Sequence, residues 1–223
     1  MNLQTIIEQL QSSQPGLAFD IDDTLSLTSD GFYDLLHPQF PAPSNLTKEH
    51  FRKHYALTGE ALHWKSIQEA YDLIKKKGDE NQFHYELSPF PDAIAQTNIL
   101  HNHHLFGCYL TARPENMYDM TTRWLQEHNF PQKPLLMRPM DIDFVSKHKE
   151  WKTTLLHTIH PHIIGLIDND TRILSHLQQQ SYPGHLYLFG LSQQEYDGNG
   201  SITVRETWTE MTKEILNNNN NNN

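Results

Sequence analysis

The chain has 223 residues, a hydrophobic fraction of 37% and a formal net charge of −10, from 27 acidic and 17 basic side chains. This negative charge argues against nucleic-acid binding as the main activity, because phosphate backbones demand a basic face. The single cysteine, Cys108, excludes an internal disulfide and suits a reducing compartment. No segment approaches the roughly 20 apolar residues of a membrane span, and the N-terminus shows no secretion signal. We therefore expect a soluble, cytoplasmic protein.

The hydrophobic pattern predicts strands that alternate with helices. In chain order we expect a helix over 3–12, a strand over 17–20, helices over 47–55, 59–77 and 90–101, a strand over 106–110, a helix over 114–125, a strand over 135–137, a helix over 149–159, a strand over 163–167, a helix over 171–180, strands over 185–189 and 202–204, and a helix over 206–216. Such alternation implies right-handed crossovers and a parallel sheet. The predicted fold class is α/β, a three-layer α/β/α Rossmann-like sheet.

Two segments depart from this alternation. Residues 30–88 begin with a stretch rich in proline and aromatic residues and continue with the predicted helices. We interpret them as a small helical insertion into a core domain formed by residues 1–29 and 89–216. The final segment, 217–223, is a tract of asparagine without apolar content, so we expect it to be disordered.

Three carboxylates follow the first predicted strand directly. Asp20, Asp22 and Asp23 come at the end of the apolar run 17–19, where open α/β sheets place their ligands. In extended backbone Asp20 and Asp22 leave the chain on the same side. Like charges so close cannot all stay ionised cheaply. A hard divalent cation such as Mg²⁺ is the obvious group to neutralise them.

Two further apolar strands also end in polar residues, and in a parallel sheet all three ends meet at one edge. The chain resembles the haloacid dehalogenase superfamily of phosphohydrolases, in the order and composition of its motifs. The matching motifs are Phe19-Asp20-Ile21-Asp22-Asp23-Thr24, then Tyr109-Leu110-Thr111-Ala112-Arg113, and Leu166-Ile167-Asp168-Asn169-Asp170, with a lysine between the last two.

The resemblance implies a role for each acid. Asp20 would be the nucleophile that forms an aspartyl phosphate, and would give one oxygen to Mg²⁺. Asp22 would act as general acid and base, and would bind the metal through its main-chain carbonyl. Asp168 would be the third protein ligand, with substrate phosphate and water completing the octahedron. Only one of the two acids, Asp20 or Asp22, can be ionised close to the cation, and the other can keep a raised pKa.

Phosphate binding requires hydrogen-bond donors and positive charge. Thr111 offers a hydroxyl and a main-chain N–H to a phosphoryl oxygen. Arg113 is a candidate for a bidentate contact, or else a surface residue. Lys152, at the start of an apolar helical pattern, is the preferred motif lysine, and Lys149 and Lys147 are the alternatives.

The sequence departs from the commonest pattern of the superfamily in two places. Asp23 stands where many relatives carry glycine, and its role is open. The last motif reads Asp168-Asn169-Asp170, without two adjacent acids. Asp170 is either a group that supports the site or the N-cap of the next helix, and Asn169 is the alternative supporting group.

These observations lead to a hypothesis of function. We expect a Mg²⁺-dependent phosphomonoesterase that acts on a small phosphorylated metabolite, with the insertion 30–88 as a cap that excludes water. The alternatives are a phosphotransferase or mutase with the same aspartyl phosphate, a 5′-nucleotidase-like enzyme, and a polynucleotide-end phosphatase, against which the charge of −10 counts. A catalytically silent binding module would not need all of Asp20, Asp22, Thr111 and Asp168. The oligomeric state is open.

Overall fold

The central element of the computed structural model is a six-stranded parallel sheet, whose strands follow the order β3-β2-β1-β4-β5-β6. The structure describes residues 3–40, 46–54, 64, 66–78, 80–198 and 200–221. The strand order reverses between β1 and β4, which is the point where open α/β sheets bind ligands. The strands are β1 (Gly16–Phe19), β2 (Phe106–Pro114), β3 (Leu135–Arg138), β4 (Ile163–Asp168), β5 (His185–Phe189) and β6 (Ile202–Arg205).

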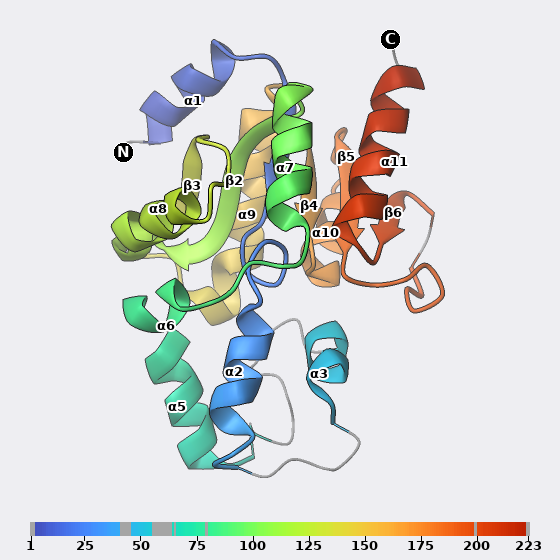
Figure 1. Cartoon of the computed structure of the whole chain (residues 1–223). Helices are drawn as coiled ribbons and strands as arrows, with labels where there is room; N and C mark the ends of the chain where they lie inside the picture. The colour runs from blue at the N-terminus through green and yellow to red at the C-terminus, as the bar shows by residue number, and fades with distance from the viewer. Residues whose placement is uncertain are drawn as a thin grey trace.

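Helices cover both faces of the sheet and make three layers (Figure 1). One face packs against α7 (Ala93–Asn102), α8 (Tyr118–Glu127) and α11 (Trp208–Asn221), and a 3-10 turn, η2 (Glu115–Met117), precedes α8. The other face packs against α1 (Leu3–Gln11), α9 (Phe144–Ile159) and α10 (Thr171–Gln179).

Strand residues alternate between the two apolar cores. In β1, Leu17 and Phe19 belong to the core under α7 and α11, while Ala18 belongs to the core under α9 and α10. In β4, Ile167 and Leu166 divide in the same way. Because both faces of a strand are buried, the sequence of each is a continuous apolar run, and this run is what identified the strands.

The insertion forms a helical layer beyond the carboxyl ends of the strands (Figure 1). Its described helices are α2 (Thr28–Leu36), α3 (Lys48–His54), α5 (Gln68–Gly78) and α6 (Asn81–Tyr85). They enclose a separate apolar cluster that contains Phe32, Leu36, Leu46, Phe51, Trp64, Ala70 and Ile74. The two connections to the core, 25–27 and 88–90, lie side by side. The N–H of Leu27 donates to Ser88 O at 2.9 Å, and that of Phe90 donates to Leu25 O at 2.8 Å.

The six strands and the predicted three-layer α/β/α class are confirmed, and the differences concern element ends and short helices. Strand β2 runs on to Pro114, α9 begins earlier, at Phe144, and α2 and α6 were not expected. Part of the helix predicted over 59–77 lies outside the described residues. None of the described helices has the length and apolar character that crossing a membrane requires.

The prediction of disorder fails over residues 217–221, because α11 continues to Asn221. The helix is fixed to the sheet by Trp208, Met211 and Ile215, which lie in the core. The side chain of Asn218 adds a hydrogen bond to Tyr187 of β5. A helix already held by packing continues into residues that would not nucleate one.

Candidate active site

Two carboxylates and one lysine meet at the switch point of the sheet. Asp20 follows β1 and Asp168 ends the neighbouring strand β4, so the parallel pairing brings both to the same edge. Lys152, from α9, lies between them, with Nζ 2.6 Å from Oδ1 of Asp20 and 2.7 Å from Oδ2 of Asp168. All three side chains are buried, and that of Lys152 is 1% exposed. The buried cluster therefore holds two acids against one cation.

Burial and charge act in opposite directions within this cluster. Burial raises the pKa of Asp20 to about 8, although the Lys152 ammonium opposes the shift. Burial raises the pKa of Asp168 as well, again against Lys152. For Lys152, burial alone would lower the pKa, but the two carboxylates outweigh it and raise the pKa above its usual value. An added positive charge would therefore stabilise the ionised carboxylates.

Asp22 faces a different partner, although it is only two residues from Asp20. Arg113 of β2 donates from Nη2 to Oδ1 of Asp22 at 2.7 Å and from Nε to Oδ2 at 3.0 Å. The Thr28 hydroxyl also donates to Oδ1, at 2.7 Å. Burial alone would raise the pKa of Asp22, but the Arg113 guanidinium outweighs it and holds that pKa well below its usual range. Of the two acids Asp20 and Asp22, Asp20 is therefore the one with the raised pKa, and Asp22 is ionised.

Thr111 and Arg113 lie side by side on β2. The Thr111 hydroxyl is buried and accepts a hydrogen bond from the main-chain N–H of Arg113 at 3.2 Å. Arg113 is not a surface residue, since its exposed fraction is 3%. Its Nη1 is buried and has no hydrogen-bond partner among the described residues. Thr111 and Arg113 thus retain donors that a phosphoryl oxygen could use.

The choice among the three candidate lysines follows from position. Lys152 is the one between Asp20 and Asp168, whereas the Nζ of Lys149 is 3.7 Å from Glu150 on a side chain that is 36% exposed. Lys147 is also exposed. Lys152 is therefore the lysine that the structure brings to the site.

The oxygen atoms around Lys152 suit a hard cation. Asp20 and Asp168 each supply a carboxylate, and the main-chain carbonyl of Asp22 accepts no hydrogen bond within the described part of the chain. No group of three or more His, Cys, Asp and Glu side chains with metal-binding geometry occurs among the described residues. Magnesium is commonly held by one or two carboxylates together with substrate phosphate and water, so this donor set fits it.

A crevice lies between α3 of the insertion and the segments that follow β1, β4 and β5. The residues of the cluster do not line it, but Asp23 and Asn169, sequence neighbours of the motif acids, do. The crevice is lined by Asp23, Glu49, Arg52, Lys53, Phe90, Asn169, Thr171, Phe189, Gly190, Leu191 and Glu206. This lining offers both polar groups and aromatic surface.

Solved structures of hydrolases match the chain over most of its length. A hydrolase from Pseudomonas syringae gives a TM-score of 0.56 at 13% identity, and the match covers 92% of this chain and 99% of that one. A haloacid dehalogenase-like family hydrolase from Streptococcus pneumoniae gives 0.59 at 16% identity, over 92% and 99%. A haloacid dehalogenase hydrolase of family IA, variant 3, from Entamoeba histolytica gives 0.54 at 14% identity, over 91% and 97%.

The fold is that of the haloacid dehalogenase-like hydrolases. No protein-family model matches the sequence, and neither does any curated protein. The likeness is therefore one of architecture, and the chemistry has to be argued from the residues of this chain.

Within the haloacid dehalogenase-like fold, Asp170 serves as a helix cap. Its carboxylate accepts from the main-chain N–H of Arg172 at 2.9 Å at the start of α10. Its own N–H donates to Oδ1 of Asp168 at 2.8 Å, so the cap also holds the motif acid in place. Asn169 lines the crevice instead.

Asp23 is buried as well, at 6% exposure, with a left-handed main chain at φ 55°. Its two carboxylate oxygens accept from Ser29 at the start of α2, from the main-chain N–H at 2.7 Å and from the hydroxyl at 2.5 Å. Burial raises the pKa of Asp23 to about 7, although the bonds from Ser29 oppose the shift. Aspartate is one of the few residues other than glycine that tolerate the left-handed conformation.

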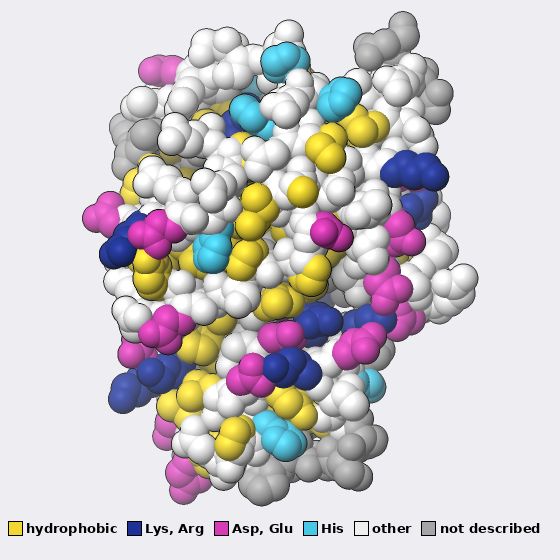
Figure 2. Space-filling model, in the orientation of Figure 1, with side chains coloured by type: hydrophobic (Ala, Val, Ile, Leu, Met, Phe, Trp, Pro, Cys, Tyr) yellow, Lys and Arg dark blue, Asp and Glu magenta, His cyan; other side chains and the backbone are white. Residues whose placement is uncertain are grey.

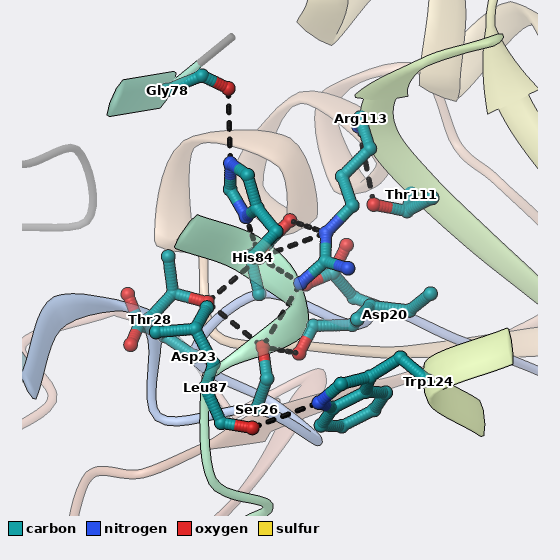
Figure 3. A network of polar contacts seen from close by, with 12 residues as sticks. Asp20, Asp23, Ser26, Thr28, Gly78, His84, Leu87, Thr111, Arg113 and Trp124 are labelled. Carbon is teal, nitrogen blue, oxygen red and sulfur yellow. Dashed lines mark hydrogen bonds and ion pairs between the residues drawn. The ribbon is translucent and has the colours of Figure 1, made fainter. Parts of the chain in front are cut away.

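Three residues around Asp22 were not predicted from the sequence. Thr28 and Ser26 form a hydrogen-bonded pair at 2.8 Å, and Ser26 lies 3.3 Å from Nη2 of Arg113 (Figure 3). His84 of α6 brings Nδ1 to 3.8 Å from Oδ1 of Asp22, while its Nε2 lies 2.9 Å from Gly78 O. The contacts of Arg113 and His84 join segments far apart in the sequence. Thr28 is the first residue of α2, and a hydroxyl residue there is a local signal of a helix N-terminus.

Proposed function

We propose that the chain is a Mg²⁺-dependent phosphomonoesterase that acts on a small phosphorylated metabolite. The observation that carries this proposal is the buried triplet of Asp20, Lys152 and Asp168 at the switch point of a haloacid dehalogenase-like fold. A carboxylate nucleophile next to a lysine and an oxygen-rich cation site is what transfer of a phosphoryl group requires.

In the first step, an oxygen of Asp20 attacks the phosphorus and the bond to the leaving alcohol breaks. The product is an aspartyl phosphate and an alkoxide that needs a proton. Lys152 neutralises charge on Asp20 and on the phosphoryl group, and Thr111 donates to a phosphoryl oxygen. Bound Mg²⁺ supplies positive charge that shields the nucleophile from the phosphate and orients the two. Asp168 and Asp20 are the side chains that would hold it.

In the second step, water attacks the phosphorus of the aspartyl phosphate while Asp22 removes a proton from the water; the bond from phosphorus to the Asp20 oxygen breaks, and inorganic phosphate leaves. The pairing with Arg113 keeps Asp22 in the basic form that this step needs. The first step needs the opposite form, a protonated Asp22 that serves the alkoxide. The unsatisfied Nη1 of Arg113 offers a donor to a phosphoryl oxygen. Sharing the guanidinium with a phosphate would weaken its hold on Asp22 and so favour proton uptake.

The insertion is the cap of this enzyme in the same proposal. Its helix α3 contributes Glu49, Arg52 and Lys53 to the crevice, which is also lined by Asn169, the residue after Asp168. A leaving group placed there is enclosed by polar and aromatic side chains, which suits a small metabolite. Closure of such a layer would also keep bulk water away from the phosphoryl group.

The test is release of phosphate from p-nitrophenyl phosphate. We expect turnover with Mg²⁺, loss of turnover in excess EDTA, and recovery when Mg²⁺ is restored. Asp20→Asn should abolish turnover and leave the circular dichroism spectrum unchanged, because the amide is isosteric but not nucleophilic. The matched control is Asp197→Asn, an exposed acid outside the crevice, which should behave as the wild type. Full metal-dependent activity of Asp20→Asn would refute the proposal.

A further inference from the structure

Asp23 is a buried acid that the proposed reaction does not use. Both of its oxygens are engaged by one residue, Ser29, through the N–H at 2.7 Å and the hydroxyl at 2.5 Å. Ser29 is 1% exposed and is the second residue of α2. The N-cap position of that helix, Leu27, makes no side-chain capping bond. The cap of α2 is thus provided by an acid six residues upstream of Ser29.

The residue next to Ser29 holds the proposed proton-transfer group. Thr28, the first residue of α2, donates its hydroxyl to Oδ1 of Asp22 at 2.7 Å. Figure 3 shows Asp23, Thr28 and Ser26 gathered below Arg113. Adjacent acids, Asp22 and Asp23, are therefore joined to adjacent residues of one helical turn. Since Thr28 and Ser29 share a peptide unit, anything that fixes Ser29 also restricts where the Thr28 hydroxyl can lie.

We propose that Asp23 is a positioning residue for Asp22. By fastening Ser29, it holds the first turn of α2 in place, so that the Thr28 hydroxyl meets Oδ1 of Asp22 and fixes the orientation of that carboxylate. This inference rests on the proposed phosphatase function, in which Asp22 transfers the proton. A small error in the direction of a proton donor lowers the rate of the step it serves, and leaves steps without proton transfer almost unaffected.

The left-handed main chain of Asp23 allows a matched pair of variants. Asp23→Asn and Asp23→Gly both accept φ 55° without strain. Only the asparagine keeps an acceptor for the Ser29 N–H. A second pair, at Thr28, tests the hydroxyl apart from the shape of the side chain. Thr28→Ser keeps the hydroxyl that bonds to Asp22, whereas Thr28→Val keeps the branched shape and loses the hydroxyl.

The measurement compares the rate of the first step for two esters, as release of the alcohol in a single turnover with enzyme in excess and Mg²⁺ present, because the second step is the same for both. p-Nitrophenolate leaves almost without a proton, whereas an alkyl phosphate such as glycerol 2-phosphate needs one. We expect Asp23→Gly and Thr28→Val to lower this rate for the alkyl ester by about 10- to 100-fold, within the range of general acid catalysis. For p-nitrophenyl phosphate the same variants should change it by less than about threefold. Asp23→Asn and Thr28→Ser should keep the wild-type ratio of the two rates.

A double variant tests whether the two residues act in one chain. Asp23→Gly combined with Thr28→Val should be no slower than Thr28→Val alone, because the second change removes what the first would misplace. Amide hydrogen exchange supplies a readout that does not depend on activity. The Ser29 N–H should exchange faster in Asp23→Gly than in Asp23→Asn.

Three results would overturn the inference. One is an unchanged rate ratio in Asp23→Gly. Another is an equal loss for both esters, which would mark a purely structural role. The third applies if Asp23→Gly does not fold, and is an unchanged ratio of the rates for the two esters in Thr28→Val. A wild-type protein that hydrolyses neither ester would instead refute the proposed phosphatase itself, and the inference with it.

Discussion

Asp20 and Asp22 stand two residues apart in opposite electrostatic surroundings. Asp20 shares one lysine with Asp168 inside the core, and burial raises its pKa to about 8. Asp22 has a guanidinium of its own, from Arg113, and its side chain is 29% exposed. Two identical side chains thereby acquire different proton affinities, which is how a pair of carboxylates can take different roles.

Cys108 illustrates a case in which burial outweighs a nearby charge, since the Lys133 ammonium favours the thiolate but does not offset the burial. It is fully buried in β2, and burial raises its pKa to about 12, from an ordinary value of 9.0. Between these values the unfolded chain loses the thiol proton and the folded chain keeps it. The folded state then binds more protons, so the free energy of unfolding falls as pH rises.

We therefore predict an excess pH dependence from this thiol. Above pH 9 the free energy of unfolding of the wild type should fall more steeply than that of Cys108→Ala, by up to about 1.4 kcal/mol per pH unit. Urea unfolding at several pH values measures the difference in slope. Parallel curves for the two proteins would contradict the assignment. The same burial predicts that iodoacetamide labels Cys108 only after unfolding.

The position of the site residues along the sequence was predictable, but their contacts were not. Asp20, Thr111 and Asp168 lie at or near the ends of apolar strands, and parallel strands present those ends at one edge. Arg113 meets Asp22 across 91 residues of sequence, through a side-chain orientation that no local pattern encodes. The raised pKa of Asp20 has the same origin, since it depends on the depth of burial.

At the scale of elements, helix starts around the site are fixed by acids from the motif loops. Asp170 caps α10, and Asp23 takes the same role for α2 from a distance. These caps join helices to the loops that follow β4 and β1. The positions of the motif acids and the orientation of the helices are thus coupled.

The cap of α10 can be tested by its effect on stability. Asp170→Ala should lower the free energy of unfolding by about 1 kcal/mol, because the N–H of Arg172 loses its acceptor. Asp170→Asn keeps an acceptor and should lose less. Urea denaturation measures both. An alanine variant as stable as the wild type, or an asparagine variant as unstable as alanine, would show that capping is not what this carboxylate contributes.

Element prediction failed where the helix signal was short or polar. The first turn of α2 is Thr28, Ser29 and Asp30, and its buried face begins with hydroxyl side chains in place of apolar ones. Helix α6 has only five residues, too few to show a period. The strands of the core were identified by their continuous apolar runs, and its longer helices by apolar residues at helical spacing. The end of α11 depends on packing, which composition does not report.

At the scale of the whole molecule, charged side chains join the insertion to the core. Figure 2 shows Lys and Arg side chains beside Asp and Glu side chains along this boundary. Lys53 of α3 brings Nζ to 2.5 Å from Glu206 and 3.3 Å from Glu195, both in the core, as well as 3.3 Å from Glu49. Lys53, Glu49 and Glu206 all line the crevice, so this lysine joins its two sides.

Charge reversal tests this junction. Lys53→Glu and Glu206→Lys should each loosen α3, because each replaces the attraction by repulsion, and the double variant should restore it. Since surface ion pairs contribute only about 0.2 to 1 kcal/mol, amide exchange in 48–54 should rise by about two- to fivefold in the single variants. High salt should reduce the difference. A double variant that exchanges as fast as the single variants would refute the junction.

The central claim is that Asp20 carries the phosphoryl group, and the most direct measurement is to find that group. Asp22→Asn lacks the base for the second step, so the covalent intermediate should accumulate. The variant would be mixed with p-nitrophenyl phosphate and Mg²⁺, quenched in acid and mapped by mass spectrometry. We predict one phosphoryl group on the peptide that contains Asp20, and none when Asp20→Asn is added. Two results would contradict this mechanism. One is a phosphoryl group on any other residue, and the other is an Asp22→Asn protein that turns over at the wild-type rate without a covalent adduct.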